Sequence, residues 1–184
     1  MGNIKSSYTL RYNNDYKVVV NFDSLVYSKE PKAIGVECLV YSANAVCDMN
    51  ESDIWYTDVG EDGSFTIYTI DPMDGRKWYL DIYSGSWPDL LGCFREDAIP
   101  PHHYVKDRGA IRVKDSPSNK CLSTRMIETH WRAKGKHIFY DEFCNECYYI
   151  RPTYGGWLQP LEFKETVITR RLPLLKYYIT KTCM

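Results

Sequence analysis

The sequence has no excess of charge of either sign. Lys and Arg together number 23, Asp and Glu number 24, and the formal net charge at pH 7 is −1. A balanced chain creates no overall field that would attract nucleic acid or an anionic bilayer. We therefore expect no nucleic-acid partner.

Long apolar runs are also missing. No stretch of roughly 18 apolar residues occurs, so we expect no membrane-spanning helix. The N-terminus lacks the hydrophobic core of a signal peptide, which favours a cytoplasmic location. In that reducing compartment the seven cysteines should be mainly free thiols, and an odd number cannot all pair within one chain. A disulfide between Cys38 and Cys47 stays open as an alternative.

Motifs of common enzymes are absent as well. The chain contains neither of the glycine-rich phosphate-binding patterns. Acid pairs such as Glu61–Asp62 lie in turn-like polar stretches, where solvated loop charges are expected. Cys93 and Cys121 lack the local signature of a thiol nucleophile. These absences favour a protein that is not an enzyme. A small metal- or thiol-dependent enzyme is the third alternative, ranked below two kinds of binding protein.

Aromatic residues, in contrast, are abundant, with 16 Tyr, 6 Phe and 5 Trp in 184 residues. Aromatic side chains favour strands and also form flat recognition surfaces. The length suits one domain with a single core. We expect a mostly β domain over residues 8–184, preceded by an extension of residues 1–7.

That extension resembles a lipidation signal. Residues 1–7 read MGNIKSS, which fits the acceptor pattern for N-myristoylation at Gly2. One myristoyl chain gives only marginal, reversible membrane binding. We expect membrane contact only if Gly2 is myristoylated, and the protein would then be peripheral.

The strongest structural signal lies between Trp55 and Gly85. Apolar and polar residues alternate over residues 64–69 and again over 77–83, and Asp74–Gly75 supplies a tight turn between them. The pattern predicts a β-hairpin whose core residues are Trp78, Leu80 and Ile82. Residues 17–22 and 34–41 are further strand candidates, and the near-continuous apolar run of the first indicates burial on both faces. Residues 42–53 read as an Asn-rich loop.

A similar outline recurs along the chain. An aromatic residue, a Gly-x-apolar-x-apolar stretch, a turn and then Lys-Cys-Leu-Ser or Lys-Trp-Tyr-Leu-Asp occur around residues 103–123 and 55–85, and a fainter copy spans 166–180. This pattern resembles the β-trefoil of ricin-B-type lectins and of related protease inhibitors. The lectin motif Gln-x-Trp is absent. The resemblance implies a single β-trefoil-like domain that acts as a binding module.

A competing interpretation concerns residues 117–134. Ser116–Pro117 is typical of a helix start, and Gly135 could end the helix. Apolar residues are spread around this helix and do not form one stripe. The alternative fold is therefore α+β, with one helix near residues 117–134.

Metal-ligating residues occur in one weak group. Cys144 and Cys147 have the spacing of a zinc half-site, and His130 and His137 upstream could complete four ligands. We expect no cofactor, with zinc as the alternative. For His102 and His103 we expect a polar loop before a strand, with metal binding or pH sensing as alternatives.

The expected function is non-enzymatic binding through loops on a rigid β scaffold. A carbohydrate is the first ligand class, because the lectin resemblance implies it and aromatic residues cluster in YYIRPTYGGW. A protein partner is the alternative, as for a protease inhibitor or a host-factor antagonist. The candidate ligand-binding residues are Asp58, Tyr83, Trp87, Arg151, Tyr154 and Trp157.

Overall fold

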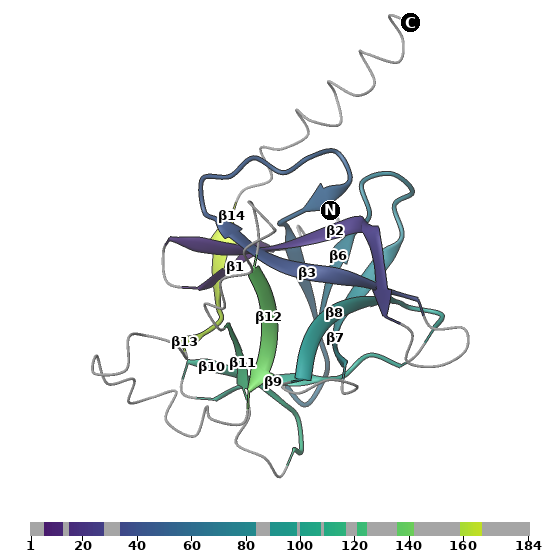
Figure 1. Cartoon of the computed structure of the whole chain (residues 1–184). Coiled ribbons are helices and arrows are strands. Elements are labelled where there is room, and N and C mark those ends of the chain that lie inside the picture. Colours follow the sequence, from purple (N-terminus) through teal and green to yellow (C-terminus); the bar gives the residue numbers. More distant parts are fainter. Residues whose placement is uncertain are drawn as a thin grey trace, which may run out of the picture.

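The regular structure of this protein is strand throughout the part of the chain that its computed structural model describes (Figure 1). That part comprises residues 6–12, 15–27, 34–83, 89–98, 100–107, 109–116, 121–124, 136–141 and 159–166. None of these residues is helical, so the expectation of a mostly β fold is confirmed. The strands are β1 (Ser7–Tyr12), β2 (Tyr16–Tyr27), β3 (Gly35–Ser42), β4 (Glu51–Ser52), β5 (Trp55–Val59), β6 (Phe65–Ile70), β7 (Lys77–Tyr83), β8 (Asp89–Arg95), β9 (Tyr104–Asp107), β10 (Ala110–Val113), β11 (Cys121–Thr124), β12 (Lys136–Asp141), β13 (Gln159–Pro160) and β14 (Glu162–Thr166).

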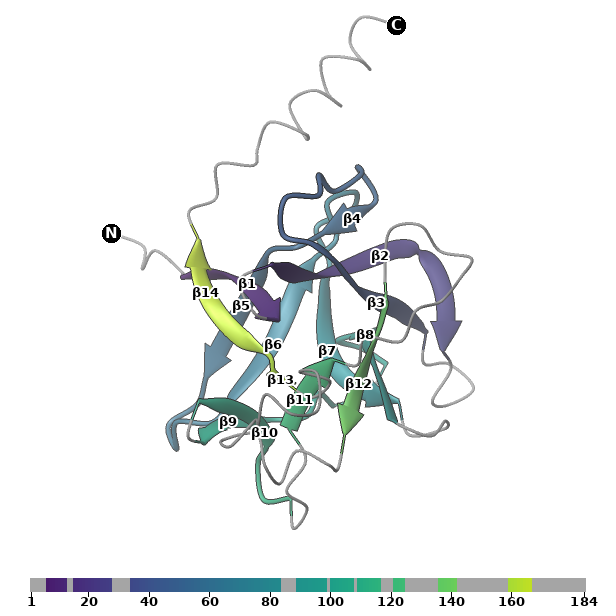
Figure 2. The same cartoon turned by 60° about the vertical axis from the view of Figure 1, so that its left-hand side comes forward.

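Seven of the strands form a closed barrel (Figures 1 and 2). Strand β1 pairs with β2, β2 with β3 and β3 with β8. The ring continues from β8 through β7, β6 and β5 back to β1, and every pairing is antiparallel. Closure leaves these strands with no long exposed edge.

The remaining strands extend the barrel. Strand β9 joins β6 at a single pair, Phe65 with Tyr104, and carries β10 on its other side. Strand β14 lies along β1, and β4 lies along β2. Strand β12 pairs with both β3 and β8. Lys136 and His137 pair with β3, and Phe139 and Tyr140 pair with β8.

Alternate residues of the seven strands fill the barrel interior. Its buried cluster includes the three residues predicted from the hairpin pattern, Trp78, Leu80 and Ile82, which confirms that prediction. Two thiols also face the interior, with 3.7 Å between Cys38 Sγ and Cys93 Sγ. Burial, followed by the contact with Cys38, raises the pKa of the Cys93 thiol well above its usual range. The other members of the cluster are Leu10, Val18, Val20, Val36, Val40, Trp55, Phe65, Ile67, Leu91, Tyr104, Ile111, Leu122 and Leu161.

The predicted hairpin exists as β6 and β7. Gly75 has φ of +74°, a left-handed conformation that glycine adopts without strain. The turn is closed by two backbone hydrogen bonds of 2.9 Å, from Asp71 N to Arg76 O and from Gly75 N to Asp71 O. The stretch from Trp55 to Gly85 was predicted to contain two strands. It also contains a third strand, β5, which pairs with β6 from Tyr56 to Val59.

Two alternatives that the sequence left open are wrong for the described residues. Cys121–Thr124 form strand β11, paired with both β12 and β13, so no helix runs through them. Burial of Cys121 and Leu122 against the barrel outweighs the local start signal at Ser116. The rest of the segment 117–134 lies outside the described residues.

The disulfide alternative also fails. Cys38 points into the barrel, whereas Cys47 packs on the outer face of β3 beside Leu39 and Tyr41. The strand therefore separates the two thiols. Cys38, Cys47, Cys93 and Cys121 are all thiols and not part of a disulfide, as expected.

The described residues include no helix long and apolar enough to cross a bilayer.

Candidate functional site

The connection from β3 to β4 forms an arch over the outside of the barrel. We call residues 43–50 the arch, and Figures 1 and 2 show it as the dark blue loop at the top of the molecule. Its sequence is ANAVCDMN, which contains no Lys or Arg.

Alternation of side chains holds the arch in place. Ala45 and Cys47 turn inward and pack on Val19, Leu39 and Tyr41, which form the outer face of β2 and β3. The intervening residue, Val46, turns outward and is 83% exposed. Met49 is 51% exposed. Large apolar side chains so exposed on an ordered loop are candidates for contact with a partner.

Backbone hydrogen bonds anchor both ends of the arch. Ala43 N donates to Asp15 O at 2.8 Å, which ties its start to the β1–β2 turn. At its end Phe22 N donates to Asn50 O at 2.9 Å. The Asn50 amide donates to Asn21 Oδ1 at 3.2 Å and to Asp23 Oδ2 at 2.5 Å. The loop is thus fixed to the β1–β2 turn at its start and to β2 at its end.

A buried ion pair supports the middle of the arch. Lys17 Nζ lies 2.8 Å from Asp53 Oδ2, and the two side chains are 1% and 2% exposed. The same ammonium donates to Ala45 O at 2.5 Å. A buried charge needs such partners, because its desolvation is otherwise uncompensated. Lys17 therefore connects strand β2, the arch and the residue that follows β4.

A tyrosine and a glutamate form a second buried contact here. Tyr41 OH donates to Glu51 Oε1 at 3.2 Å. Burial, followed by the nearby negative charge of Glu51, raises the pKa of the Tyr41 phenol far above its ordinary value. The phenol is thus held neutral as a donor. Glu51 directly follows the arch, so this contact ties the chain at the end of the arch to β3.

Another polar cluster lies farther along the outer wall. Glu37 and Asp81 both pair with Gly92, so the two buried carboxylates share one face with the glycine between them. Ser24 Oγ donates to Glu37 Oε2 at 3.1 Å. His102 Nδ1 contacts Asp81 Oδ1, with the imidazole 45% exposed. A buried carboxylate can orient a histidine for acid–base chemistry. The contact between His102 and Asp81 also attaches the loop that precedes β9 to strand β7.

His102 and His103 do lie in a polar loop that precedes strand β9, as expected from the sequence. The partner of His102 could not be predicted, since Asp81 belongs to the alternating pattern of a distant strand.

Two of the six predicted ligand-binding residues lie in the described part of the chain, and they belong to different strands. Asp58 lies on β5, where its carboxylate is 3.7 Å from Lys77 Nζ of β7. Tyr83 ends β7, and its backbone pairs with Leu90. Four of the predicted residues lie outside the described part of the chain: Trp87, Arg151, Tyr154 and Trp157.

The predicted zinc ligands and lipidation site are largely untested. His137 lies on β12 opposite Leu39 of β3. Within the described residues, no three His, Cys, Asp or Glu side chains are grouped to hold a metal ion. The remaining residues of both predictions, Gly2, His130, Cys144 and Cys147, lie outside the described part.

The sequence identified residues 42–53 as a loop but did not mark them as a site. The sequence contained one signal that could have identified this loop as a site. Four apolar residues lie in an otherwise polar stretch: Ala45, Val46, Cys47 and Met49. Which of them face outward depends on the packing of Ala45 and Cys47 on β2 and β3.

Comparisons of this chain with protein-family models, with curated proteins and with solved structures found no match.

Proposed function

We propose that this protein is a non-enzymatic binding module that recognises another protein through the arch. The observation that carries the proposal is an anchored loop that presents Val46 and Met49 to solvent. The barrel is the scaffold, and the arch is the recognition element. This is the protein-binding alternative predicted from the sequence.

Rigidity of the arch is what supports a binding role. A loop that is already ordered loses little conformational entropy when it binds, so more of the contact energy appears as affinity. The arch has hydrogen bonds at Ala43, Ala45 and Asn50, and the donor to Ala45 O is the Lys17 ammonium. Solvent-exposed apolar side chains on such a support are suited to fill pockets of a partner.

Two finer expectations stay predictions. The β-trefoil likeness is compatible with a barrel that presents loops, and its threefold repeat awaits a test. Carbohydrate binding depends mainly on Trp87 and Trp157, which lie outside the described residues. The arch offers two aliphatic side chains, whereas sugar rings are typically bound by aromatic faces.

Interaction capture with matched variants tests the proposal. The full-length protein, a Val46→Asp/Met49→Asp double variant and a Val59→Asp control are immobilised and exposed to an extract of the native host. Val59 is 67% exposed at the end of β5, where it pairs with Phe65 of β6, so it reports on non-specific apolar contact outside the arch. Bound proteins are quantified by mass spectrometry, and each candidate is then measured in purified form.

We expect at least one protein whose affinity falls about tenfold or more in the double variant and is unchanged in the control. Thermal unfolding should be nearly the same for all three proteins, because the altered side chains are exposed. Equal capture of every ligand by the wild type and the double variant would overturn the proposal. Glycan-array binding lost in Trp87→Ala or Trp157→Ala but retained in the double variant would favour the carbohydrate alternative.

A further inference from the structure

We propose that Cys38 and Cys93 form an oxidation site inside the barrel, where a two-electron oxidant joins β3 to β8 through a disulfide. The proposal concerns the barrel interior and does not depend on the role of the arch. It starts from the distance of 3.7 Å between Cys38 Sγ and Cys93 Sγ, whose side chains are both 0% exposed.

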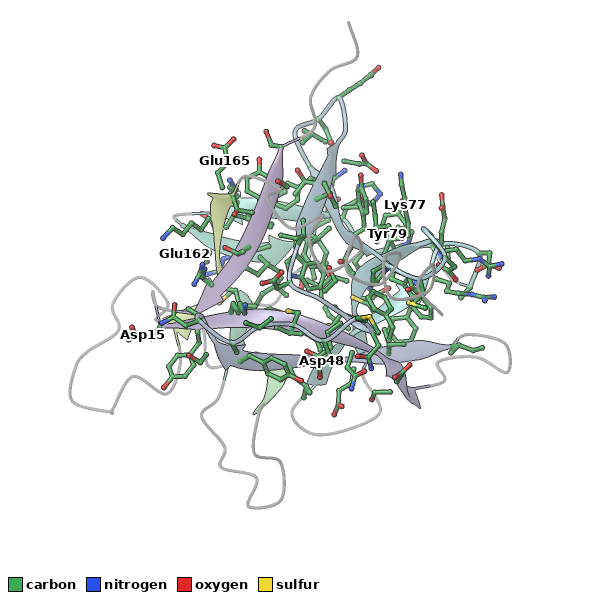
Figure 3. The ribbon with its side chains drawn as sticks, turned by 90° about the horizontal axis from the view of Figure 1, so that it is seen from above. Asp15, Asp48, Lys77, Tyr79, Glu162 and Glu165 are labelled. Carbon is green, nitrogen blue, oxygen red and sulfur yellow. The ribbon has the colours of Figure 1, made fainter. Side chains whose placement is uncertain are left out.

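Both thiols face the interior because of the way their strands pair. Lys77 and Tyr79 of β7 lie near each other in the view from above (Figure 3), whereas Leu80, which alternates with them, belongs to the interior cluster. Cys93 pairs with Leu80 and so shares its inward face. Cys38 of β3 belongs to the same cluster. The two sulfur atoms therefore meet inside the barrel wall, across neighbouring strands.

The thiol pair lies where β3 and β8 separate. The ladder that the two strands share has three residue pairs, and it ends at Glu37 with Gly92. From Leu39 onward β3 pairs with β12, and β8 pairs with β12 at Leu90. Cys38 lies between the end of one ladder and the start of the other. A disulfide at this point joins β3 to β8 just beyond the end of their hydrogen-bonded contact.

A small movement brings the sulfur atoms to bonding distance. The S–S bond is about 2.05 Å long, so the two atoms must approach by roughly 1.7 Å. Cys38 is diagonal to Cys93, because the residue that pairs with Cys93 is Val36. Diagonal neighbours lie farther apart than direct partners, so side-chain rotation must be accompanied by a shift of the strands. Such a shift breaks the fewest hydrogen bonds at the end of a ladder, which is where this pair lies.

Hydrogen peroxide supplies the chemistry of a two-electron oxidant. One thiolate attacks an oxygen of the peroxide, so that an S–O bond forms, the O–O bond breaks and hydroxide leaves with its electron pair. The second thiolate attacks the sulfenic sulfur, an S–S bond forms, and the S–O bond breaks with loss of a second hydroxide. The two thiol protons convert the hydroxides to water. Two thiols and one peroxide thus give one disulfide and two waters.

Burial should make this reaction slow in the folded protein. Burial raises the pKa of the Cys93 thiol well above its usual range, so little thiolate is present near neutral pH. Neither thiol is exposed, so peroxide reaches them when the strands open locally. We expect the oxidation rate to rise with pH, and to rise with urea at concentrations below the unfolding transition.

Peptide mapping of the oxidised wild type tests the proposal. The full-length protein is incubated with hydrogen peroxide at pH ~8 and at urea concentrations up to the start of its unfolding transition. Remaining thiols are alkylated, and the digest is analysed by mass spectrometry with and without dithiothreitol. We expect a dithiothreitol-sensitive link between the peptides that contain Cys38 and Cys93. Mapping distinguishes this link from disulfides of the remaining cysteines, which are Cys47, Cys121, Cys144, Cys147 and Cys183.

Matched variants give a second readout. Cys38→Ala removes one partner, and the control Cys121→Ala removes a thiol of β11 that is also 0% exposed. The link joins residues 55 positions apart, so it restricts the unfolded chain. We expect peroxide treatment to raise the urea midpoint by about 1 M in the wild type and in Cys121→Ala, and to leave that of Cys38→Ala unshifted.

Two results would overturn the proposal. The first is recovery of Cys38 and Cys93 as thiols, as higher oxidation products or in disulfides with other cysteines, at every urea concentration. The second is a midpoint shift in Cys38→Ala equal to that of the wild type, which would assign the stabilisation to another oxidation. If Cys38→Ala does not fold, the peptide map of the wild type decides the question by itself.

Discussion

Residues Lys17–Val20 of β2 and Gly35–Tyr41 of β3 are buried on both faces of the strands, and the two faces are built differently. The inward face is apolar, with Val18, Val20, Val36 and Val40 around the Cys38 thiol. The outward face lies under the arch and mixes apolar with charged and polar groups, as the pairing of Lys17 with Asp53 and of Tyr41 with Glu51 shows.

The difference separates two requirements of the fold. Apolar packing is non-directional, so the interior needs volume and shape but no particular partner for each atom. The outer face has directional contacts, because each buried charge or hydroxyl must meet a defined atom. We therefore interpret the packing of the barrel interior as the main source of stability. The polar contacts of the outer face hold the arch in its position.

The largest expected effect comes from breaking the buried ion pair. Asp53→Ala leaves the Lys17 ammonium buried without its carboxylate, and the free energy of unfolding should fall by about 3–5 kcal/mol. Urea unfolding followed by circular dichroism measures the change. The double variant Lys17→Met/Asp53→Leu should recover most of the loss. If the single variant is as stable as the wild type, the charges do not support the arch.

Paired core truncations compare the two faces directly. Leu80→Ala inside the barrel and Leu39→Ala under the arch should each lower the free energy of unfolding by about 2–5 kcal/mol. Leu39 should lie at the lower end of that range, because the arch can settle into part of the cavity. Denaturant unfolding of both variants measures the two losses of free energy. A larger loss for Leu39→Ala than for Leu80→Ala would contradict our interpretation of the interior as the main source of stability.

A smaller and pH-dependent effect is expected at Tyr41. Since burial raises its pKa in the folded state, the neutral phenol stabilises the protein fully below pH ~10, and this contribution is lost as the pH rises through the folded-state value. Tyr41→Phe should cost about 1 kcal/mol at pH 7 and should flatten the alkaline fall in stability. Unfolding free energies measured from pH 8 to about 11 test this, and parallel curves for the two proteins would refute it.

The smallest effect is expected from an exposed ion pair of the same chemical type. The pKa of Asp62 is lowered by its hydrogen bonds from Lys114 and Ser64, so its contribution is present above pH ~4 and is lost as the pH falls toward the folded-state value. Both partners are solvent-exposed and screened. Asp62→Asn should change the thermal midpoint much less than Asp53→Ala does, and the change should shrink with added salt. If Asp62→Asn lowers the thermal midpoint as much as Asp53→Ala does, burial does not explain the larger effect expected at Asp53.

Much of the strand content could be predicted from local patterns. The alternation over residues 77–83 and the Asp74–Gly75 turn identify β6 and β7, and the apolar run of residues 17–22 indicates burial on both faces, which the structure confirms for Val18, Val19 and Val20. The candidate site was predicted only as a loop. Its contacts join Lys17 to Ala45 and Asp53, and such non-local pairing leaves no mark on either segment alone.

The sequence by itself determined the β class of the fold, the β6–β7 hairpin and the core identity of Trp78, Leu80 and Ile82. Periods of two and turn residues act over a few neighbouring positions, so a single strand or hairpin carries its own evidence. Tertiary structure alone decided that the ring closes between β5 and β1, that Cys121–Thr124 extend as a strand, and that Val46 faces outward. Each of these depends on distant segments meeting, and it is the packing free energy of those contacts that selects one arrangement.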